Sequence, residues 1–168
     1  LATEVNGGNN YSNTYFKIPE TVTETIELST DDGYVPIGND TNQFEGTFDG
    51  GNHTINLNLT GERLVGLFGE GGENSNLCNI RTTGSVSMTG YYAGGIVSNM
   101  YGNVVNCHNE ASVTGYYHVG GIVGISDNSK YIINCSNSGA IVGNMNVGGI
   151  VGNISTLKVI NCLNTGTV

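Results

Sequence analysis

The sequence predicts an all-β fold, a right-handed parallel β-helix with three short strands per coil and about five coils. Two observations predict it. A unit of roughly 26 to 29 residues recurs along the chain, and each unit holds three short β-branched segments separated by Gly, Asn and Ser turns. No helical periodicity lies between these segments. Equivalent strands of successive coils are therefore expected to pair in parallel at about 4.8 Å.

The first recurring segment is a Gly-Gly-Ile-Val sequence. It stands at 94–97, 120–123 and 148–151, and a looser copy stands at 65–69. Paired glycines permit positive φ or a close approach of two backbones, so we expect them at corners of the coil. The strand-to-helix setting of a phosphate-binding loop is missing around them, so nucleotide binding is not predicted.

The second recurring segment, of the type Ile-Asn-Cys-x-Asn, predicts columns of like side chains. The expected inward column is Leu57, Ile80, Cys107, Cys135 and Cys162. The expected asparagine columns are Asn56, Asn79, Asn106, Asn134 and Asn161, and then Asn109, Asn137 and Asn164. We interpret the cysteines as small apolar residues with free thiols, in preference to disulfides or zinc ligands. Asparagine tolerates left-handed backbone and its amide can bond along a stack, which favours a structural ladder over a ligand site.

A third segment, a short Val-bearing or Ile-bearing strand, completes each unit. It recurs at 84–86, 111–113, 139–141 and 166–168. The repeats predict one domain over 1–168, with irregular N-terminal coils in 1–73 and regular repeats in 74–168. We also expect this domain to be a piece of a longer protein, with further coils or a cap beyond Val168, because a bare solenoid end exposes apolar core and strand edges.

Charge is unevenly placed along the chain. The net charge is −9, and residues 1–73 carry twelve acids against Lys17 and Arg63. No basic stripe is present, so nucleic acid is not an expected partner. No apolar run approaches the roughly 20 residues that a membrane-spanning helix needs, so membrane insertion is not expected either.

Most of the sequence over residues 26–168 resembles a known family of repeats. The segments Tyr34-Val35-Pro36-Ile37-Gly38, Phe44 through Ile55 (with Gly46-Thr47-Phe48-Asp49-Gly50 the most specific part) and Gly66-Leu67-Phe68-Gly69 are similar to the GLUG-motif family. Those repeats occur in bacterial surface proteins and in the non-catalytic N-terminal region of immunoglobulin A metalloproteases. The resemblance implies a secreted or surface-attached bacterial protein. Tyr34 stands where the family often has Trp, and Ser98 replaces the last Gly of one repeat.

Catalytic chemistry is not predicted in this chain. A hydrolase or lyase on a β-helix places several carboxylates on adjacent coils of one face, and the regular coils offer only Glu110 and Asp127. The acids of the first half leave two alternatives open. Asp31, Asp32, Asp40, Glu45 and Asp49 could converge in a carbohydrate-active site, and Asp31 with Asp32 is a candidate for a calcium site. No cofactor and no other metal is predicted.

One set of residues is a candidate binding surface. Tyr91 and Tyr117 occupy one repeat position, Tyr92 and His118 the next, and Tyr116 precedes them. An exposed tyrosine row can stack on sugar rings or anchor a protein partner, although it can equally cover a corner of the core.

The functional prediction is accordingly a non-catalytic extracellular module. It would act as an adhesin-like binding surface or a rigid stalk, with a host protein or a glycan as partner and further domains in the same chain. The alternatives are an accessory domain of an immunoglobulin A protease-like metalloprotease and a carbohydrate-active β-helix enzyme.

Overall fold

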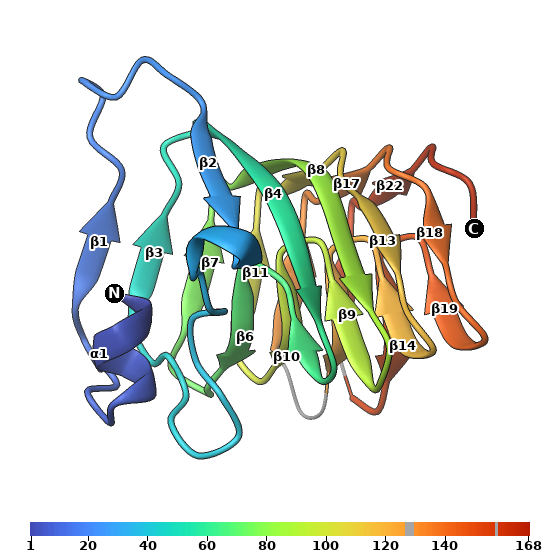
Figure 1. Ribbon diagram of the computed structural model, residues 1–168, viewed down its shortest axis with the longest axis horizontal. Helices are drawn as coiled ribbons and strands as arrows, with labels where there is room; N and C mark the ends of the chain where they lie inside the picture. The colour runs from blue at the N-terminus through green and yellow to red at the C-terminus, as the bar shows by residue number, and fades with distance from the viewer. Residues whose placement is uncertain (127–129, 157) are drawn as a thin grey trace.

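A computed structural model describes residues 1–126, 130–156 and 158–168. It confirms the predicted fold, a β-solenoid of about five turns in which the strands of successive coils pair in parallel. Figure 1 shows the coils stacked along one long axis, from the N-terminal helix at one end to the last coil at the other. In the described residues no helix is both long and apolar enough to cross a membrane.

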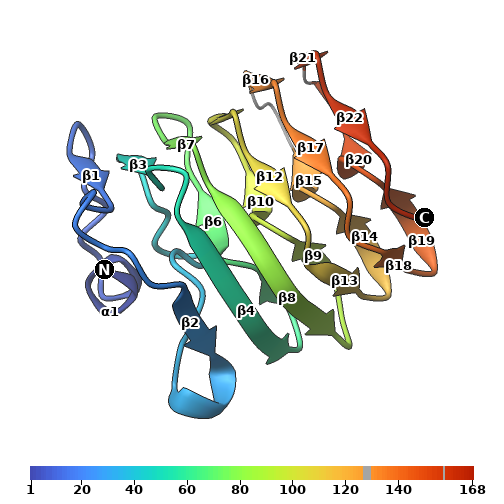
Figure 2. The same cartoon turned by 90° about the horizontal axis from the view of Figure 1, so that it is seen from above.

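In the part of the chain that the structure describes, four parallel sheets run along the solenoid, and Figure 2 shows them from above. Sheet A consists of β1 (Tyr15–Lys17), β3 (Thr47–Asp49), β7 (Asn76–Cys78), β11 (Asn103–Val105), β16 (Tyr131–Ile133) and β21 (Lys158–Ile160). Sheet B consists of β2 (Ile26–Ser29), β4 (Thr54–Gly61), β8 (Arg81–Met88), β12 (His108–Asn109), β13 (Ser112–Thr114), β17 (Ser136–Asn137), β18 (Ile141–Val142) and β22 (Leu163–Asn164).

The other two sheets flank the glycine-rich segments. Sheet C consists of β6 (Phe68–Gly71), β10 (Val97–Met100), β15 (Val123–Ser126) and β20 (Val151–Ile154). Sheet D consists of β5 (Leu64–Val65), β9 (Tyr92–Gly94), β14 (Tyr117–Gly120) and β19 (Met145–Gly148). The glycine-rich segment predicted as one part of each coil thus contains two strands. The first Gly of each pair ends a strand of sheet D, and the next strand, on sheet C, begins after the second Gly.

The core consists of apolar columns that follow directly from the strand register. On sheet A, Leu77, Val104 and Ile132 stack on one another and are fully buried. Val86, Val113 and Ile141 do the same on sheet B, Val97 and Val123 on sheet C, and Ala93 and Val119 on sheet D. Parallel in-register pairing places each apolar residue over its counterpart, so the repeat pattern produces a continuous interior.

The N-terminal end of this interior is closed by a short helix, α1 (Ala2–Asn6). Val5 on that helix is fully buried. Asn6 holds the following loop in place: its Nδ2 donates to the Pro36 carbonyl at 3.0 Å, and its Oδ1 accepts from the Gly38 N–H at 2.9 Å. The Asn42 amide donates to the Asn6 carbonyl at 2.7 Å. The helix therefore fixes the position of the loop over residues 36–42.

The cysteine segment forms the expected stack in the regular coils but not in the first one. The pairing of Arg81 with His108 and of His108 with Ser136 places Ile80, Cys107 and Cys135 in consecutive coils, each about 1% exposed. All four cysteines are free. Burial raises the pKa of the Cys107 thiol well above its usual range, as expected for an inward-facing, inert thiol.

The prediction that Leu57 and Asn56 belong to these columns is wrong. Leu57 pairs with Gly84 and Asn56 with Thr83, four residues beyond Ile80 and Asn79. Both residues lie on strand β4, whereas Asn79 and Ile80 form the short turn before β8. The corresponding turn before β4, residues 50–53, is two residues longer. Leu57 is still inward and buried, but it lies in a different column.

Two asparagine ladders run along the solenoid, one outside and one inside. Asn79, Asn106, Asn134 and Asn161 all have left-handed backbone, with φ between 51° and 54°. In this outer ladder the Asn134 amide donates to Asn106 Oδ1 at 3.2 Å. The inner ladder is tighter: Asn109 Nδ2 donates to Asn137 Oδ1, and Asn137 Nδ2 donates to Asn164 Oδ1, both at 2.7 Å. The left-handed backbone explains the choice of asparagine in the outer ladder, and buried amide bonding explains it in the inner one.

We expect Asn137→Ala to lower the free energy of unfolding by about 1–3 kcal/mol, because it removes the hydrogen bonds of Asn137 to Asn109 and Asn164 and leaves one N–H of the buried Asn109 amide without a partner. Asn137 is 1% exposed, and it also donates to the Gly139 carbonyl at 2.9 Å. Urea denaturation followed by circular dichroism measures the change. Asn134→Gly is the matched control, since it removes an exposed amide from the same coil while keeping the left-handed backbone accessible. Equal losses of stability in the two variants would show that the buried inner ladder stabilises the fold no more than the exposed outer ladder does.

Candidate functional site

The candidate binding face lies at the corner where the chain enters sheet D. The register of β5, β9, β14 and β19 places Arg63, Tyr91, Tyr117 and Met145 in one column on consecutive coils. The column turns outward, since Tyr91 is 56% and Met145 48% exposed. Parallel pairing thus converts one repeat position into a row of a cation, two phenol rings and a thioether.

The tyrosine rings of this column form an aromatic cluster. Tyr91 and Tyr117 are stacked, with ring centroids 6.0 Å apart and ring planes 16° from parallel. Tyr116 meets Tyr117 edge to face at 4.7 Å and is itself 48% exposed. These arrangements are the ones that the ring quadrupole favours. The cluster therefore holds its rings in a fixed orientation while presenting them to solvent.

A second column runs beside the first. It contains Tyr92, His118 and Asn146, with the rings of Tyr92 and His118 5.3 Å apart. Asn146 Nδ2 lies 3.3 Å from His118 Nδ1. His118 and Asn146 both have positive φ, 47° and 53°. These two residues occupy a left-handed corner, where polar side chains are better tolerated than β-branched ones.

A pocket of about 320 Å³ lies against the first ring of the row. It is lined by Arg63, Tyr91 and Tyr92. An aromatic wall beside a guanidinium group suits a flat, hydroxyl-bearing ligand, because the ring takes the apolar face of a sugar and the cation can donate to its hydroxyl groups.

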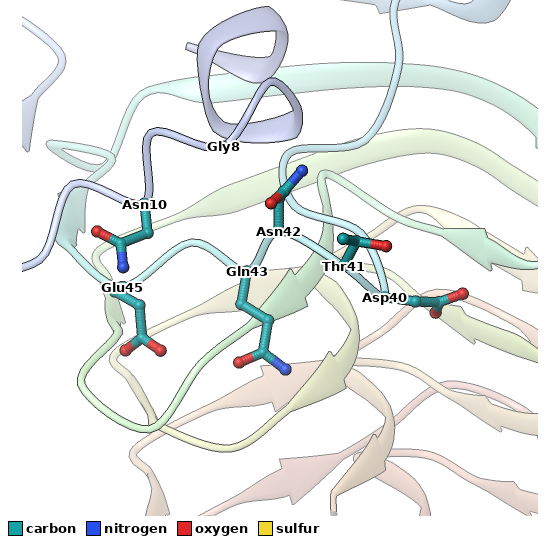
Figure 3. A pocket seen from close by; sticks show the side chains of 7 residues that line it. All are labelled: Gly8, Asn10, Asp40, Thr41, Asn42, Gln43 and Glu45. Carbon is teal, nitrogen blue, oxygen red and sulfur yellow. The ribbon is translucent and has the colours of Figure 1, made fainter.

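A second pocket, of about 380 Å³, was not anticipated from the sequence. Figure 3 shows its lining, which comes from the segment after α1 and from the loop that Asn6 positions. Seven residues line it: Gly8, Asn10, Asp40, Thr41, Asn42, Gln43 and Glu45. Asp40 and Glu45 belong to the acidic first half of the sequence. The amide residues Asn10, Asn42 and Gln43 lie outside the repeats, so no sequence pattern indicates them.

An ion pair connects the two pockets. Arg63 Nη1 lies 2.6 Å from Asp40 Oδ2, and both side chains are partly exposed. Arg63 lines the aromatic pocket and Asp40 lines the polar one. The two pockets are therefore neighbours on one surface.

A buried acid lies behind the polar pocket. Glu70 is 4% exposed and accepts from Gln43 Nε2 at 2.7 Å. Burial raises the pKa of the Glu70 carboxyl, and the nearby charge of Asp40 adds to this, while the bond from Gln43 works in the opposite direction. Glu70 anchors the amide of Gln43, which faces the pocket.

Asp31, Asp32 and Asp49 do not line this pocket. Asp31 and Asp32 lie on a 3-10 turn (Thr30–Asp32) beside sheet B, with both side chains exposed. Asp49 lies on sheet A and accepts from Tyr15 Oη at 2.6 Å, Asn79 Nδ2 at 2.9 Å and the Gly51 N–H at 2.9 Å. Burial of Asp49 works to raise its pKa, but these hydrogen bonds and Lys17 outweigh it and hold the pKa below its usual value.

Metal ligands do not gather in the described part of the chain. Among residues 1–126, 130–156 and 158–168, no three His, Cys, Asp or Glu side chains are grouped so that they could hold a metal ion. Asp127, one of the two acids of the regular coils, lies outside the described residues. Glu110 is engaged by Arg81 at 3.3 Å and by His108 at 3.2 Å.

Comparison with known proteins gives two similarities. The chain is 38% identical over 112 residues to halomucin of Haloquadratum walsbyi, a match that covers 61% of this chain and 1% of that protein. Its fold is similar to the crystal structure of a candidate immunoglobulin A1 protease from Bacteroides ovatus, with a TM-score of 0.63, 20% identity, and coverage of 94% of this chain and 62% of that one. No protein-family model matches the chain. The GLUG resemblance therefore stays a prediction.

Proposed function

We propose that the chain is a non-catalytic, extracellular β-solenoid module that binds a glycan through its aromatic face. The observation that carries the proposal is the stacked pair Tyr91 and Tyr117 beside the pocket that Arg63 and Tyr92 complete. Exposed aromatic side chains in fixed orientation contribute binding surface at low entropic cost.

The two similar proteins support the setting of this proposal. The fold recurs in a protein described as a candidate immunoglobulin A1 protease, and part of the sequence recurs in halomucin. Because the chain spans 62% of the first protein and 1% of the second, the activity of either whole protein comes to this chain only as a hypothesis. The names of these two proteins favour a surface or secreted protein, and we propose an adhesin-like role for this module. The proposed bacterial origin comes from the GLUG resemblance.

A second candidate function is an accessory domain of an immunoglobulin A protease-like enzyme. The observation that favours it is the structural similarity, which extends over 94% of this chain. In that case the aromatic face would position the enzyme on a glycosylated substrate. The two candidates share the same binding surface and differ in the domains with which it is linked.

Binding is tested with an array of immobilised neutral and acidic oligosaccharides. We expect the protein to bind a subset of the array, and Tyr91→Ala to weaken that binding about tenfold, because it removes the ring that forms the wall of the pocket. Tyr131→Ala is the matched control, since Tyr131 is an exposed tyrosine on sheet A, away from the row. Equal losses in the two variants, or no saccharide bound by the native protein, would refute the proposed function.

A further inference from the structure

The aromatic pocket and the polar pocket meet at the Arg63–Asp40 ion pair, which contributes one residue to each. We infer that the two pockets form a single extended site for an uncharged oligosaccharide. One sugar unit stacks against Tyr91 in the aromatic pocket, and another hydrogen-bonds in the polar pocket. This inference rests on the proposed function and specifies the ligand class and the second half of the site.

Three amide side chains of the polar pocket, Asn10, Asn42 and Gln43, are each held by a hydrogen bond through one polar atom, and the other polar atom remains available to a ligand. Asn10 Oδ1 accepts from the Ser12 N–H at 3.1 Å. Asn42 Nδ2 donates to the Asn6 carbonyl at 2.7 Å, and Gln43 Nε2 donates to Glu70 at 2.7 Å. Among the described residues, Asn10 Nδ2, Asn42 Oδ1 and Gln43 Oε1 make no hydrogen bond to protein.

These three leftover atoms comprise a donor and two acceptors, and Figure 3 shows the three amide side chains that carry them. Sugar hydroxyl groups both donate and accept, so they satisfy such a mixed set, whereas a purely anionic group requires donors alone. Anchoring also lowers the entropic cost of binding, because the side chains need not be ordered by the ligand. The pocket is therefore prepared for hydroxyl groups.

Charge excludes acidic sugars from the same site. Asp40 and Glu45 both line the polar pocket, and no Lys, Arg or His lines it among the described residues. The guanidinium group of Arg63 is engaged by Asp40, so its charge is offset on the aromatic side. Residues 1–73 are strongly acidic as a whole. A uronic or sialic acid unit would meet net repulsion, while a neutral unit would not.

The length of the ligand tests whether the pockets act as one site. Isothermal titration calorimetry is performed on the whole chain with maltose, mannobiose and cellobiose and with the corresponding hexasaccharides, and with hexagalacturonate as the acidic probe. We expect at least one neutral hexasaccharide to bind about tenfold more tightly than its disaccharide, because only the longer ligand occupies both pockets. Wild-type protein is expected not to bind hexagalacturonate.

Three variants separate the halves of the site. Gln43→Ala should weaken hexasaccharide binding about fivefold and leave disaccharide binding unchanged. Asn58→Ala, which removes an exposed amide on sheet B, is the control and should change neither. Asp40→Asn should create measurable hexagalacturonate binding, because it releases the charge of Arg63. Thermal melting confirms that each variant is folded.

Two outcomes would overturn the inference. If affinity is independent of length and Gln43→Ala has no effect, while Tyr91→Ala still abolishes disaccharide binding, then the joined site is wrong and the proposed function stands. If no neutral saccharide binds at millimolar concentration, both are wrong.

Discussion

Cys135→Asp is expected to lower the free energy of unfolding by about 3–5 kcal/mol, because it places a carboxylate without a partner inside the column of buried thiols. Cys135 is 1% exposed, and its Sγ contacts the Ile133 carbonyl at 3.3 Å. A carboxylate at this position would face carbonyl oxygens, which cannot donate to it. Urea denaturation monitored by circular dichroism gives the change directly.

Cys135→Val is the matched control for this substitution. Ile80, 1% exposed, shows that the same inward position accepts a larger β-branched side chain two coils earlier. Val is larger than Cys but smaller than Ile, so the column has room for it, and the expected change is within about 1.5 kcal/mol. If Asp were tolerated as well as Val, the column would be open to water and the description of the core would be wrong.

Gly120→Val should lower the free energy of unfolding by at least about 3 kcal/mol or prevent folding, because the corner has no room for a side chain. A Cβ at Gly120 would overlap the carbonyl oxygen of Val123 and would lie 2.8 Å from the Gly152 nitrogen. Gly94 and Gly148 meet the carbonyl oxygens of Val97 and Val151 in the same way. The yield of soluble protein and its melting temperature measure the effect.

Gly33→Asn is a suitable control for the glycine substitution. Gly33 has φ +84°, and a Cβ at this residue would meet no atom within 4 Å. Asparagine tolerates this left-handed backbone, so we expect a change of less than about 0.5 kcal/mol. A large loss at Gly33, or none at Gly120, would show that steric exclusion does not explain the glycine pairs.

The regular coils could be predicted from the sequence because their periods differ by only a residue or two. In that region the Cys107 and Cys135 column, the Asn109 and Asn137 ladder and the Tyr91 and Tyr117 pair all follow from aligning the repeats. For the paired glycines of the corners, the sequence leaves two explanations open, positive φ and a close approach of two backbones. Gly120 and Gly121 do not have positive φ, so close approach is the correct one.

The first coils could not be predicted in the same way because their turns differ in length. The turn after Asp49 is two residues longer than its counterpart, and Asn56 and Leu57 lie on the strand beyond it, although their Ile-Asn pattern resembles that of a turn. The polar pocket depends on contacts between α1, a loop and the first coil, over about 30 residues or more of sequence. No repeat marks such contacts, and propensity alone does not place one loop against another.

The column that begins with Arg63 and ends with Met145 has a consequence for how such a surface can evolve. Each member belongs to a different coil and projects outward, while the apolar residues that define the coil point inward at other positions. Exchanging one outward residue alters a single step of the surface and leaves the interior packing untouched. Binding specificity can therefore change through single substitutions in this column, while the fold stays the same.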